Sequence, residues 1–179
     1  MKNSRLVWGS LLALLVFGCG GQAEVQKAAG TPDPLAFLSP GERELIIETN
    51  KARVDNGVPE LEVNQKCTEF AREQSEDMDT CHYFEHVRPA CKTRETTGPV
   101  EAESFGERAK RRGFTRSMVS ENLFFSTAGT AARAVEGWLN SPGHRKNMLD
   151  KNAVSIGVGI VGNYWTQCFT SEDGIPLKN

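Results

Sequence analysis

The last third of the sequence contains two strand-like runs, residues 154–161 and 164–170, which are separated by Gly162-Asn163. Both runs are rich in β-branched and aromatic residues, and a two-residue Gly-Asn connection is typical of an antiparallel hairpin. The first run alternates large apolar residues with small ones: Ile156, Val158 and Ile160 against Ser155, Gly157 and Gly159. A face of small residues allows another element, most simply a helix, to approach closely. The chain is therefore expected to fold around a hairpin with a helix on its glycine face.

Helical signals precede this hairpin. Residues 39–42 (Ser-Pro-Gly-Glu) and residues 104–107 (Ser-Phe-Gly-Glu) are capping boxes, which mark helix starts. The first predicts a helix to about Asn56, and the second predicts a short basic helix that ends at Gly113. Three further helical segments are predicted: one that follows Asn64, one over residues 131–139, and one that begins at Ser141-Pro142. Helices followed by a long hairpin predict the α+β class.

The N-terminal region has the pattern of an export signal. Residues 1–18 contain Lys2 and Arg5 and then an apolar stretch of about a dozen residues, which is too short to span a membrane comfortably. Residues 15–19 (Leu-Val-Phe-Gly-Cys) resemble a bacterial lipobox, in which Cys19 would be lipidated and would anchor the chain to a membrane. Small and polar residues then predict a flexible tether over residues 19–38, before a folded domain over residues 39–179.

Five cysteines are an odd number for an exported chain. If Cys19 carries lipid, four remain, and an even set in an oxidising compartment indicates two disulfides. Of the three possible pairings, we favour Cys81–Cys91, which closes a short loop, and Cys67–Cys168, which joins the second helix to the last strand. A zinc site made of cysteine thiolates is the alternative, but no C-x₂-C pair is present.

Composition limits the classes of partner. The 179 residues include 21 Lys plus Arg and 23 Asp plus Glu, so the formal charge is −2. This balance gives no broad basic surface for nucleic acid. An apolar fraction of 39% also argues against disorder of the whole chain.

Only three histidines are available for acid–base or metal chemistry. His82 and His86 are four residues apart, but nearby Pro89 makes a shared helical face doubtful, so they are a weak metal pair. His144 lies in the first turn of the helix that begins after Ser141. Ser141 itself is interpreted as a helix cap rather than a nucleophile, because Pro142 follows it at the first helical position.

Several segments, read in chain order, resemble the CAP superfamily (cysteine-rich secretory, antigen 5 and pathogenesis-related proteins), in its bacterial SCP-like branch. They are Asn50-Lys51-Ala52-Arg53, Gly57-Val58-Pro59-Glu60-Leu61, Ala71 to Met78 followed by Phe84-Glu85-His86, Ser120-Glu121-Asn122-Leu123, Trp138 to Leu149, Ile156-Gly157-Val158-Gly159, and Tyr164-Trp165-Thr166-Gln167. The resemblance covers about residues 40–171, and the segment from Trp138 to Arg145 is its most specific part.

The resemblance implies a three-layer α-β-α sandwich with a cleft. In the wider family this cleft presents two His and two Glu, which bind a divalent cation in some members. Carried over by motif, three of these positions are His86, Glu121 and His144, and the fourth falls on Ser141, which removes one ligand. Two imidazoles and one carboxylate could still hold a divalent cation such as Zn²⁺, and the same set occurs in hydrolases.

Three functions are consistent with these residues. The sequence contains neither the G-x-S-x-G nor the H-E-x-x-H motif, and its cysteines are explained by pairing, so an enzyme is not favoured. The resemblance implies a binding module for a lipid or sterol-like ligand or for an envelope protein. The alternatives are a metal-dependent hydrolase that uses His86, Glu121 and His144, and a structural envelope protein with a vestigial cleft.

Overall fold

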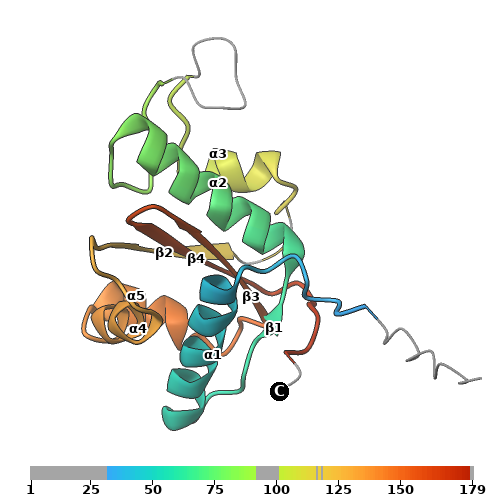
Figure 1. Cartoon of the computed structure of the whole chain (residues 1–179). Coiled ribbons are helices and arrows are strands. Elements are labelled where there is room, and N and C mark those ends of the chain that lie inside the picture. Colours follow the sequence, from blue (N-terminus) through green and yellow to red (C-terminus); the bar gives the residue numbers. More distant parts are fainter. Residues whose placement is uncertain (1–31, 92–100, 116, 118, 178–179) are drawn as a thin grey trace, which may run out of the picture. The chain divides into compact units, whose positions relative to one another are not determined.

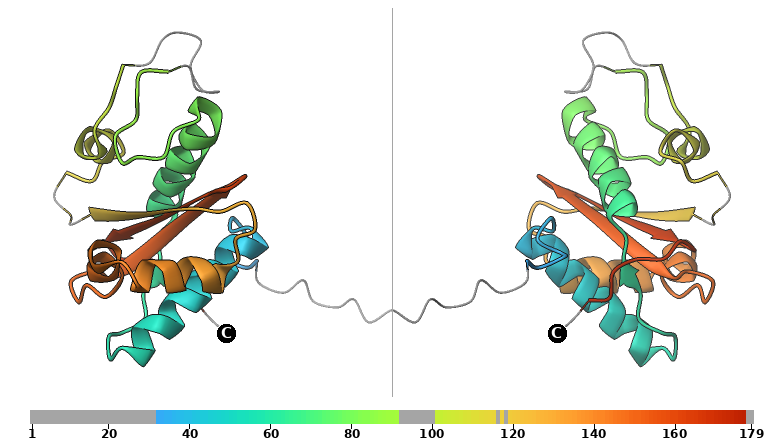
Figure 2. Two further views of the ribbon diagram at one scale, coloured as in Figure 1. Left: turned by 90° about the vertical axis from the view of Figure 1, so that its left-hand side faces the viewer. Right: turned by 90° about the vertical axis from the view of Figure 1, so that its right-hand side faces the viewer.

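The structure is a computed structural model that describes residues 32–91, 101–115, 117 and 119–177. The signal segment, Cys19 and residues 19–31 of the tether lie outside the described residues. From Pro32 onwards the chain folds into three layers, with α2 and α3 on one face of a sheet and α1, α4 and α5 on the other (Figures 1 and 2). The predicted mixed α-β-α sandwich is confirmed.

The two long helices begin at the predicted caps. Helix α1 (Pro40–Asp55) starts with the capping box of Ser39 and Glu42, and Gly57 follows its end with φ +72°. Helix α2 (Gln65–Cys81) is capped by Asn64, whose side chain accepts a hydrogen bond from the backbone N–H of Cys67 at 2.9 Å. It ends where His82 takes a left-handed conformation. His82 and His86 therefore do not share a helical face.

Three shorter helices also match the sequence pattern. Helix α3 (Phe105–Arg111) has the predicted capping box of Ser104 and Glu107. Helix α4 (Ala131–Leu139) is capped by Thr130, and helix α5 (Pro142–Met148) begins after Ser141. The indole N–H of Trp138 donates to the carbonyl of Leu123 at 2.8 Å, which fixes α4 against the sheet.

The sheet has four strands in the order β1-β3-β4-β2. Strands β3 (Ser155–Val161) and β4 (Tyr164–Thr170) form the predicted hairpin, and β1 (Glu62–Val63) pairs with β3 in parallel. Strand β2 (Val119–Phe125) runs antiparallel to β4 at the other edge. Strand β2 was not predicted, because its polar residues interrupt the apolar alternation that marks a strand. Polar partners pack against both of its faces.

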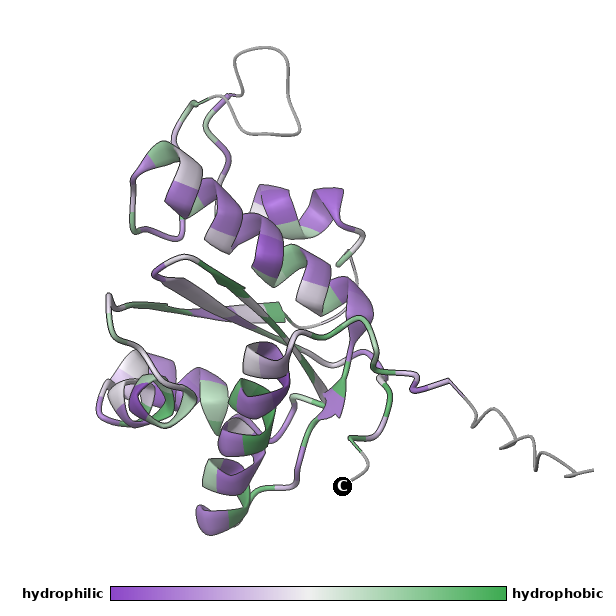
Figure 3. Cartoon of the chain, viewed as in Figure 1, coloured by the Kyte–Doolittle hydropathy of each residue, from purple (hydrophilic) through white to green (hydrophobic). Residues whose placement is uncertain are grey.

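The glycine face of β3 lies directly against α2, as predicted. A Cβ atom on Gly157 would come within 2.0 Å of the backbone of Thr68, and one on Gly159 within 2.3 Å of the backbone of Arg72. Figure 3 shows hydrophilic residues over most of α2 and α3. The small buried core beneath these helices consists of Cys67, Phe70, Ala71, Ala109, Phe114 and Cys168.

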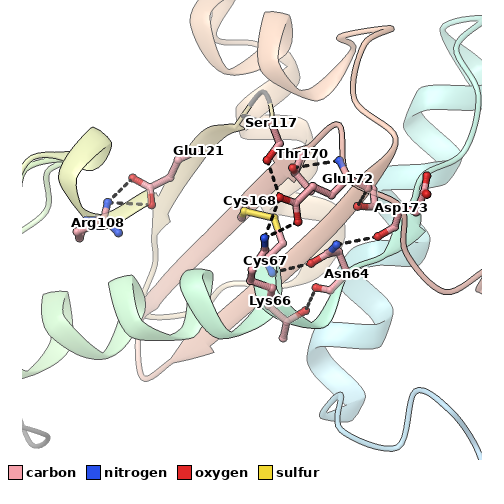
Figure 4. The surroundings of a disulfide bond; sticks show 12 residues. Asn64, Lys66, Cys67, Arg108, Ser117, Glu121, Cys168, Thr170, Glu172 and Asp173 are labelled. Atoms are coloured by element: carbon pink, nitrogen blue, oxygen red, sulfur yellow. Dashed lines mark hydrogen bonds and ion pairs between the residues drawn. A yellow bond between two sulfur atoms is a disulfide. The ribbon is translucent and has the colours of Figure 1, made fainter. Parts of the chain in front are cut away.

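Both predicted disulfides are present. Cys67 of α2 is bonded to Cys168 of β4, with 5.5 Å between their Cα atoms (Figure 4). Cys81 at the end of α2 is bonded to Cys91, with 6.2 Å between their Cα atoms. The first bond joins helix to sheet, and the second closes the segment that contains His86.

The packed domain begins a few residues before the predicted boundary at residue 39. Leu35 and Leu38 are only 2% and 8% exposed and belong to the core on the α1 side of the sheet. The C-terminal part of the expected tether, from Pro32, is therefore part of the folded unit. Among the residues described, no helix combines the length and the apolar character that a membrane span requires.

Candidate functional site

The candidate site is organised by the edge strand β2. Glu121 lies near the middle of this strand and is paired with Cys168 of β4, so its side chain points to the same face of the sheet as the Cys67–Cys168 disulfide. The carboxylate is 1% exposed. Both of its oxygens accept hydrogen bonds from Nη2 of Arg108, each at 3.1 Å (Figure 4).

Arg108 reaches Glu121 from the buried side of α3. Its side chain is fully buried, and its Nη2 also donates to the backbone carbonyl of His86 at 3.2 Å. The guanidinium carbon lies 4.8 Å from the ring centre of Phe70 and 5.8 Å from that of Phe105, at cation–π distances. Its Nε and Nη1 have no hydrogen-bond partner among the described residues.

His86 lies in the segment that follows α2. Its Nδ1 is 2.9 Å from Oε1 of Glu121, while half of its side chain is exposed. The segment is fixed by its neighbours: Gln74 donates to the carbonyl of Glu85 at 2.7 Å, and Arg88 forms a backbone bridge with Glu103. The Cys81–Cys91 disulfide closes the same segment. His86 is therefore held over Glu121 by a disulfide, by side-chain hydrogen bonds and by a backbone bridge.

Asn122, the next residue in β2, points to the opposite face and positions His144. It is fully buried and donates to the backbone carbonyl of His144 at 3.0 Å and to the side chain of Gln167 at 3.1 Å. Asn147 of the same helix, α5, donates to the carbonyl of Glu121 at 3.1 Å. Partial burial, together with the charge of His86, lowers the pKa of His144. The structure thus brings His86, Glu121 and His144 to the same edge of the sheet.

Ser141, the fourth position of the predicted set, occupies the N-cap of α5. Its hydroxyl makes no capping hydrogen bond, although its backbone carbonyl accepts one from the N–H of Arg145 at 2.8 Å. The predicted position in the helix is therefore observed without the side-chain bond that usually accompanies it. Among the residues that the structure describes, no base is hydrogen-bonded to the Ser141 hydroxyl that could make it a nucleophile.

An exposed aromatic cluster lies at the end of β2. We use this name for Phe84, Phe125 and Tyr164, whose ring centres are 5.0 to 6.5 Å apart. Phe125 and Tyr164 are opposite each other in β2 and β4, and Phe84 comes from the segment that contains His86. Phe84 is 48% exposed and Phe125 is 46% exposed. Three aromatic rings that meet at the surface form an apolar patch of the kind that marks binding sites.

Comparison with known proteins identifies the family. The model of the cysteine-rich secretory protein family, CAP, matches residues 46–169. This range includes His86, Glu121 and His144, which we call the His/Glu group. The chain belongs to the CAP family. Two curated relatives come from Bacillus subtilis (strain 168). The uncharacterized membrane protein YlbC is 36% identical over 72% of this chain and 34% of its own length, and the uncharacterized protein YkwD is 33% identical over 84% and 54%.

Solved structures show the same CAP fold. An extracellular protein containing an SCP domain from Bacillus anthracis str. Ames superposes with a TM-score of 0.62 at 28% identity, over 75% of this chain and 44% of that one. An outer surface protein from Borrelia burgdorferi superposes with a TM-score of 0.57 at 18% identity, over 75% of this chain and 96% of that one. Two of these relatives, YlbC and the Bacillus anthracis protein, are more than twice as long as the part that this CAP domain matches.

The metal ion that some CAP proteins bind does not fit the arrangement of these side chains. Both oxygens of Glu121 are bonded to Arg108, and Nδ1 of His86 is bonded to the same carboxylate. Within the described part of the chain, no three His, Cys, Asp or Glu side chains are grouped to hold a metal ion. The zinc site stays a prediction, and the position of Arg108 counts against it.

Arg108 was not identified from the sequence as part of the site. It lies within a run of charged residues, 107–112, that resembles a solvent-exposed helix face. The available signal was its spacing. Arg108 follows Phe105 by three residues and precedes Ala109, so it lies on the apolar face of α3. A charged residue on the buried face of a helix requires a buried partner of opposite charge, and here that partner is Glu121.

Proposed function

We propose that this protein is an exported CAP-domain lipoprotein of the cell envelope that acts as a non-enzymatic binding module for an apolar ligand, the acyl part of an envelope lipid. The exposed aromatic cluster carries the proposal. Phe84 and Phe125 are each about half exposed and meet the partly buried ring of Tyr164, and Phe84 comes two residues before the half-exposed His86 in the same segment. An apolar patch with a polar rim suits a ligand that has an apolar chain and a polar head.

The state of Glu121 supports binding over hydrolysis. A hydrolase of the His₂Glu type needs a free carboxylate or a metal-bound water near both imidazoles. Here both oxygens of Glu121 accept hydrogen bonds from a buried guanidinium. Among the described residues, no hydrogen bond joins the side chain of Ser141 to a base. The metal-dependent hydrolase is therefore the weaker candidate.

Export is supported by the relatives and by the cysteines. The Bacillus anthracis neighbour is described as extracellular, the Borrelia burgdorferi neighbour as an outer surface protein, and YlbC as a membrane protein. Two disulfides in a small domain suit an oxidising compartment. Together with the lipobox-like residues 15–19, these observations favour a mature chain that begins at a lipidated Cys19.

The ligand proposal is tested with palmitic acid that carries a fluorophore, titrated into the purified mature chain with Cys19→Ala. Saturable binding is expected for this protein, and Phe84→Ser with Phe125→Ser should weaken it by about tenfold or more, because the two rings supply most of the exposed apolar contact. Ile47→Ser with Val54→Ser is the matched control, since these side chains are also exposed but lie on α1. Equal binding by all three proteins, or no binding by any, would contradict the proposal and favour a structural role or a protein partner.

The anchor is tested separately by fractionating cells. A chain with two or more acyl groups stays with the membrane, whereas one without them does not. Cys19→Ala should therefore move the protein from the membrane fraction to the soluble fraction, or block its processing. Retention of a variant that has been processed normally, as tightly as the parent, would show that Cys19 is not the anchor.

A further inference from the structure

Three arginines of the described chain are buried, and the two least exposed, Arg53 and Arg108, have different partners. Arg53 of α1 is 1% exposed and donates only to backbone carbonyls, those of Pro59, Met148 and Asp150, at 2.6 to 3.1 Å. Arg108 of α3 is fully buried and directs a single nitrogen, Nη2, at both oxygens of Glu121. Arg53 therefore has a structural role, since it joins separate backbone segments by hydrogen bonds. Arg108 is paired with the one carboxylate of the His/Glu group.

The side-chain hydrogen bonds of Arg108 to the described residues all go to the His/Glu group. Its Nε and Nη1 have no hydrogen-bond partner among the described residues, and the rings of Phe70 and Phe105 lie against the guanidinium. Aromatic faces stabilise a cation without taking its donors. All of its observed hydrogen bonds therefore go to Glu121 and to the backbone carbonyl of His86.

We propose that Arg108 is the resident cation of this His/Glu group, and that its guanidinium occupies the place beside Glu121 where a metal ion would otherwise bind. The positive charge neutralises the buried carboxylate, so that no dissociable ion is needed for that purpose. A divalent cation at the same carboxylate would lie next to a guanidinium that keeps its charge at all physiological pH values. The two cations exclude each other.

The pairing of Arg108 with Glu121 also determines which ring nitrogen of His86 carries the proton and how the imidazole is oriented. An ionised carboxylate only accepts hydrogen bonds, so Nδ1 of His86 must carry the proton that it shares with Glu121 at 2.9 Å. The remaining ring nitrogen, Nε2, belongs to a side chain that is half exposed. Arg108 is thus a positioning residue, which fixes Glu121 and, through it, the orientation of the imidazole.

The proposal predicts that a metal site can be opened by removing one side chain. In Arg108→Met the apolar packing against Phe70 is largely retained, while both oxygens of Glu121 lose the hydrogen bond from Arg108 and Oε1 keeps the one from His86. Zn²⁺ alone, titrated into the purified mature chain by calorimetry and by thermal denaturation, is the probe. Arg108→Met should bind zinc about tenfold or more tightly than the parent, because the buried positive charge that repels the metal ion no longer lies beside the carboxylate. Its melting temperature should rise with zinc concentration, because only the folded state holds the site.

Two further variants separate this outcome from non-specific binding. Arg111→Met removes a charge from the same helix, but the side chain of Arg111 is 43% exposed and pairs with Glu73 and Glu103, so its zinc response should equal that of the parent. Adding Glu121→Gln to Arg108→Met should abolish the gain, since the freed carboxylate is its source. A gain that survives Glu121→Gln would overturn the proposal.

The parent chain provides a test that does not depend on the folding of Arg108→Met. If Arg108 excludes the metal, the parent and Glu121→Gln should give the same weak response to zinc, from exposed histidines alone. Proton–nitrogen NMR of the parent should also place the ring proton of His86 on Nδ1, and zinc should leave that signal unchanged. Zinc binding by the parent that Glu121→Gln removes would show that Arg108 does not replace the metal.

Discussion

The two faces of the sheet are stabilised in different ways. On the side of α1, α4 and α5, seventeen buried apolar residues form one core, whereas on the side of α2 and α3 the buried apolar core has six residues, two of them cysteines. The smaller core is supplemented by both disulfides and by ion pairs around Glu73, Asp77 and Arg88. Covalent and ionic contacts therefore supplement the stabilisation of the face of α2 and α3, whereas apolar burial stabilises the face of α1, α4 and α5.

The difference extends to the two neighbouring residues at the centre of the site. Glu121 points to the face of α2 and α3, where it meets a charged partner, Arg108. Asn122 points to the opposite face and joins an uncharged series of hydrogen bonds through Gln167 to Thr49 of α1. Alternation along one strand thus places the charged half of the site on the face that depends on disulfides and ion pairs. Conditions that weaken these contacts should affect His86 and Glu121 before they affect the large core.

The largest effect is expected from removing the Cys67–Cys168 disulfide. In the loop-entropy model its 101-residue separation stabilises the fold by about 4.7 kcal/mol, whereas the 10-residue loop of Cys81–Cys91 contributes about 2.7 kcal/mol. Paired alanine substitutions, measured by urea denaturation, should therefore cost more at Cys67 and Cys168 than at Cys81 and Cys91. The opposite order, or no loss at either pair, would show that the smaller core does not rely on its disulfides.

An intermediate effect is expected from acid on the same face. Burial raises the pKa of Glu73, but hydrogen bonds from Arg111 and Arg112 outweigh it and hold the pKa below its ordinary value of 4.5. A lowered pKa in the folded state gives stability that is present above 4.5 and is lost as the pH falls through the folded value. The parent should therefore lose more stability than Glu73→Gln when the pH falls below about 4.5, as measured by denaturation at each pH.

The control for this titration is Glu44→Gln. Glu44 is an exposed acid of α1, so its substitution removes the same charge from outside the ion-pair cluster. Its acid profile should follow that of the parent. Parallel curves for the parent and Glu73→Gln would instead mean that the cluster contributes no stability that depends on pH.

The parts of this fold that depend on local signals could be predicted from the sequence. Capping boxes located α1 and α3, and the Gly162-Asn163 turn located the hairpin, because each of these depends on residues close together in the chain. Strand β2 was missed because its conformation is imposed by pairing with β4, 45 residues away at Asn122 and Gln167. The partnership of Arg108 with Glu121 was missed for a related reason. Charge runs look alike in sequence, and only the packing of α3 distinguishes the buried member.

The smallest effect is expected at Ser141, on the face with the large core. Two helices on that face, α1 and α5, begin with Ser-Pro, but only Ser39 makes a side-chain cap bond, to the backbone N–H of Glu42 at 3.3 Å. Ser39→Ala should cost about 1 kcal/mol, the usual loss for an N-cap hydrogen bond. Ser141→Ala should change the free energy of unfolding by less than about 0.5 kcal/mol, since no such bond is lost.

The comparison also separates a structural from a functional role for Ser141. Helix α5 is held to β2 by side-chain amides, through Asn122 to the carbonyl of His144 and through Asn147 to that of Glu121. These bonds do not involve the hydroxyl of Ser141, so both the stability and the fatty-acid binding of Ser141→Ala should match the parent. A loss of binding at unchanged stability would make the hydroxyl a ligand contact. A loss of stability as large as that of Ser39→Ala would mean that α5 depends on a bond from this hydroxyl, and the amides of Asn122 and Asn147 would not be sufficient to hold the helix.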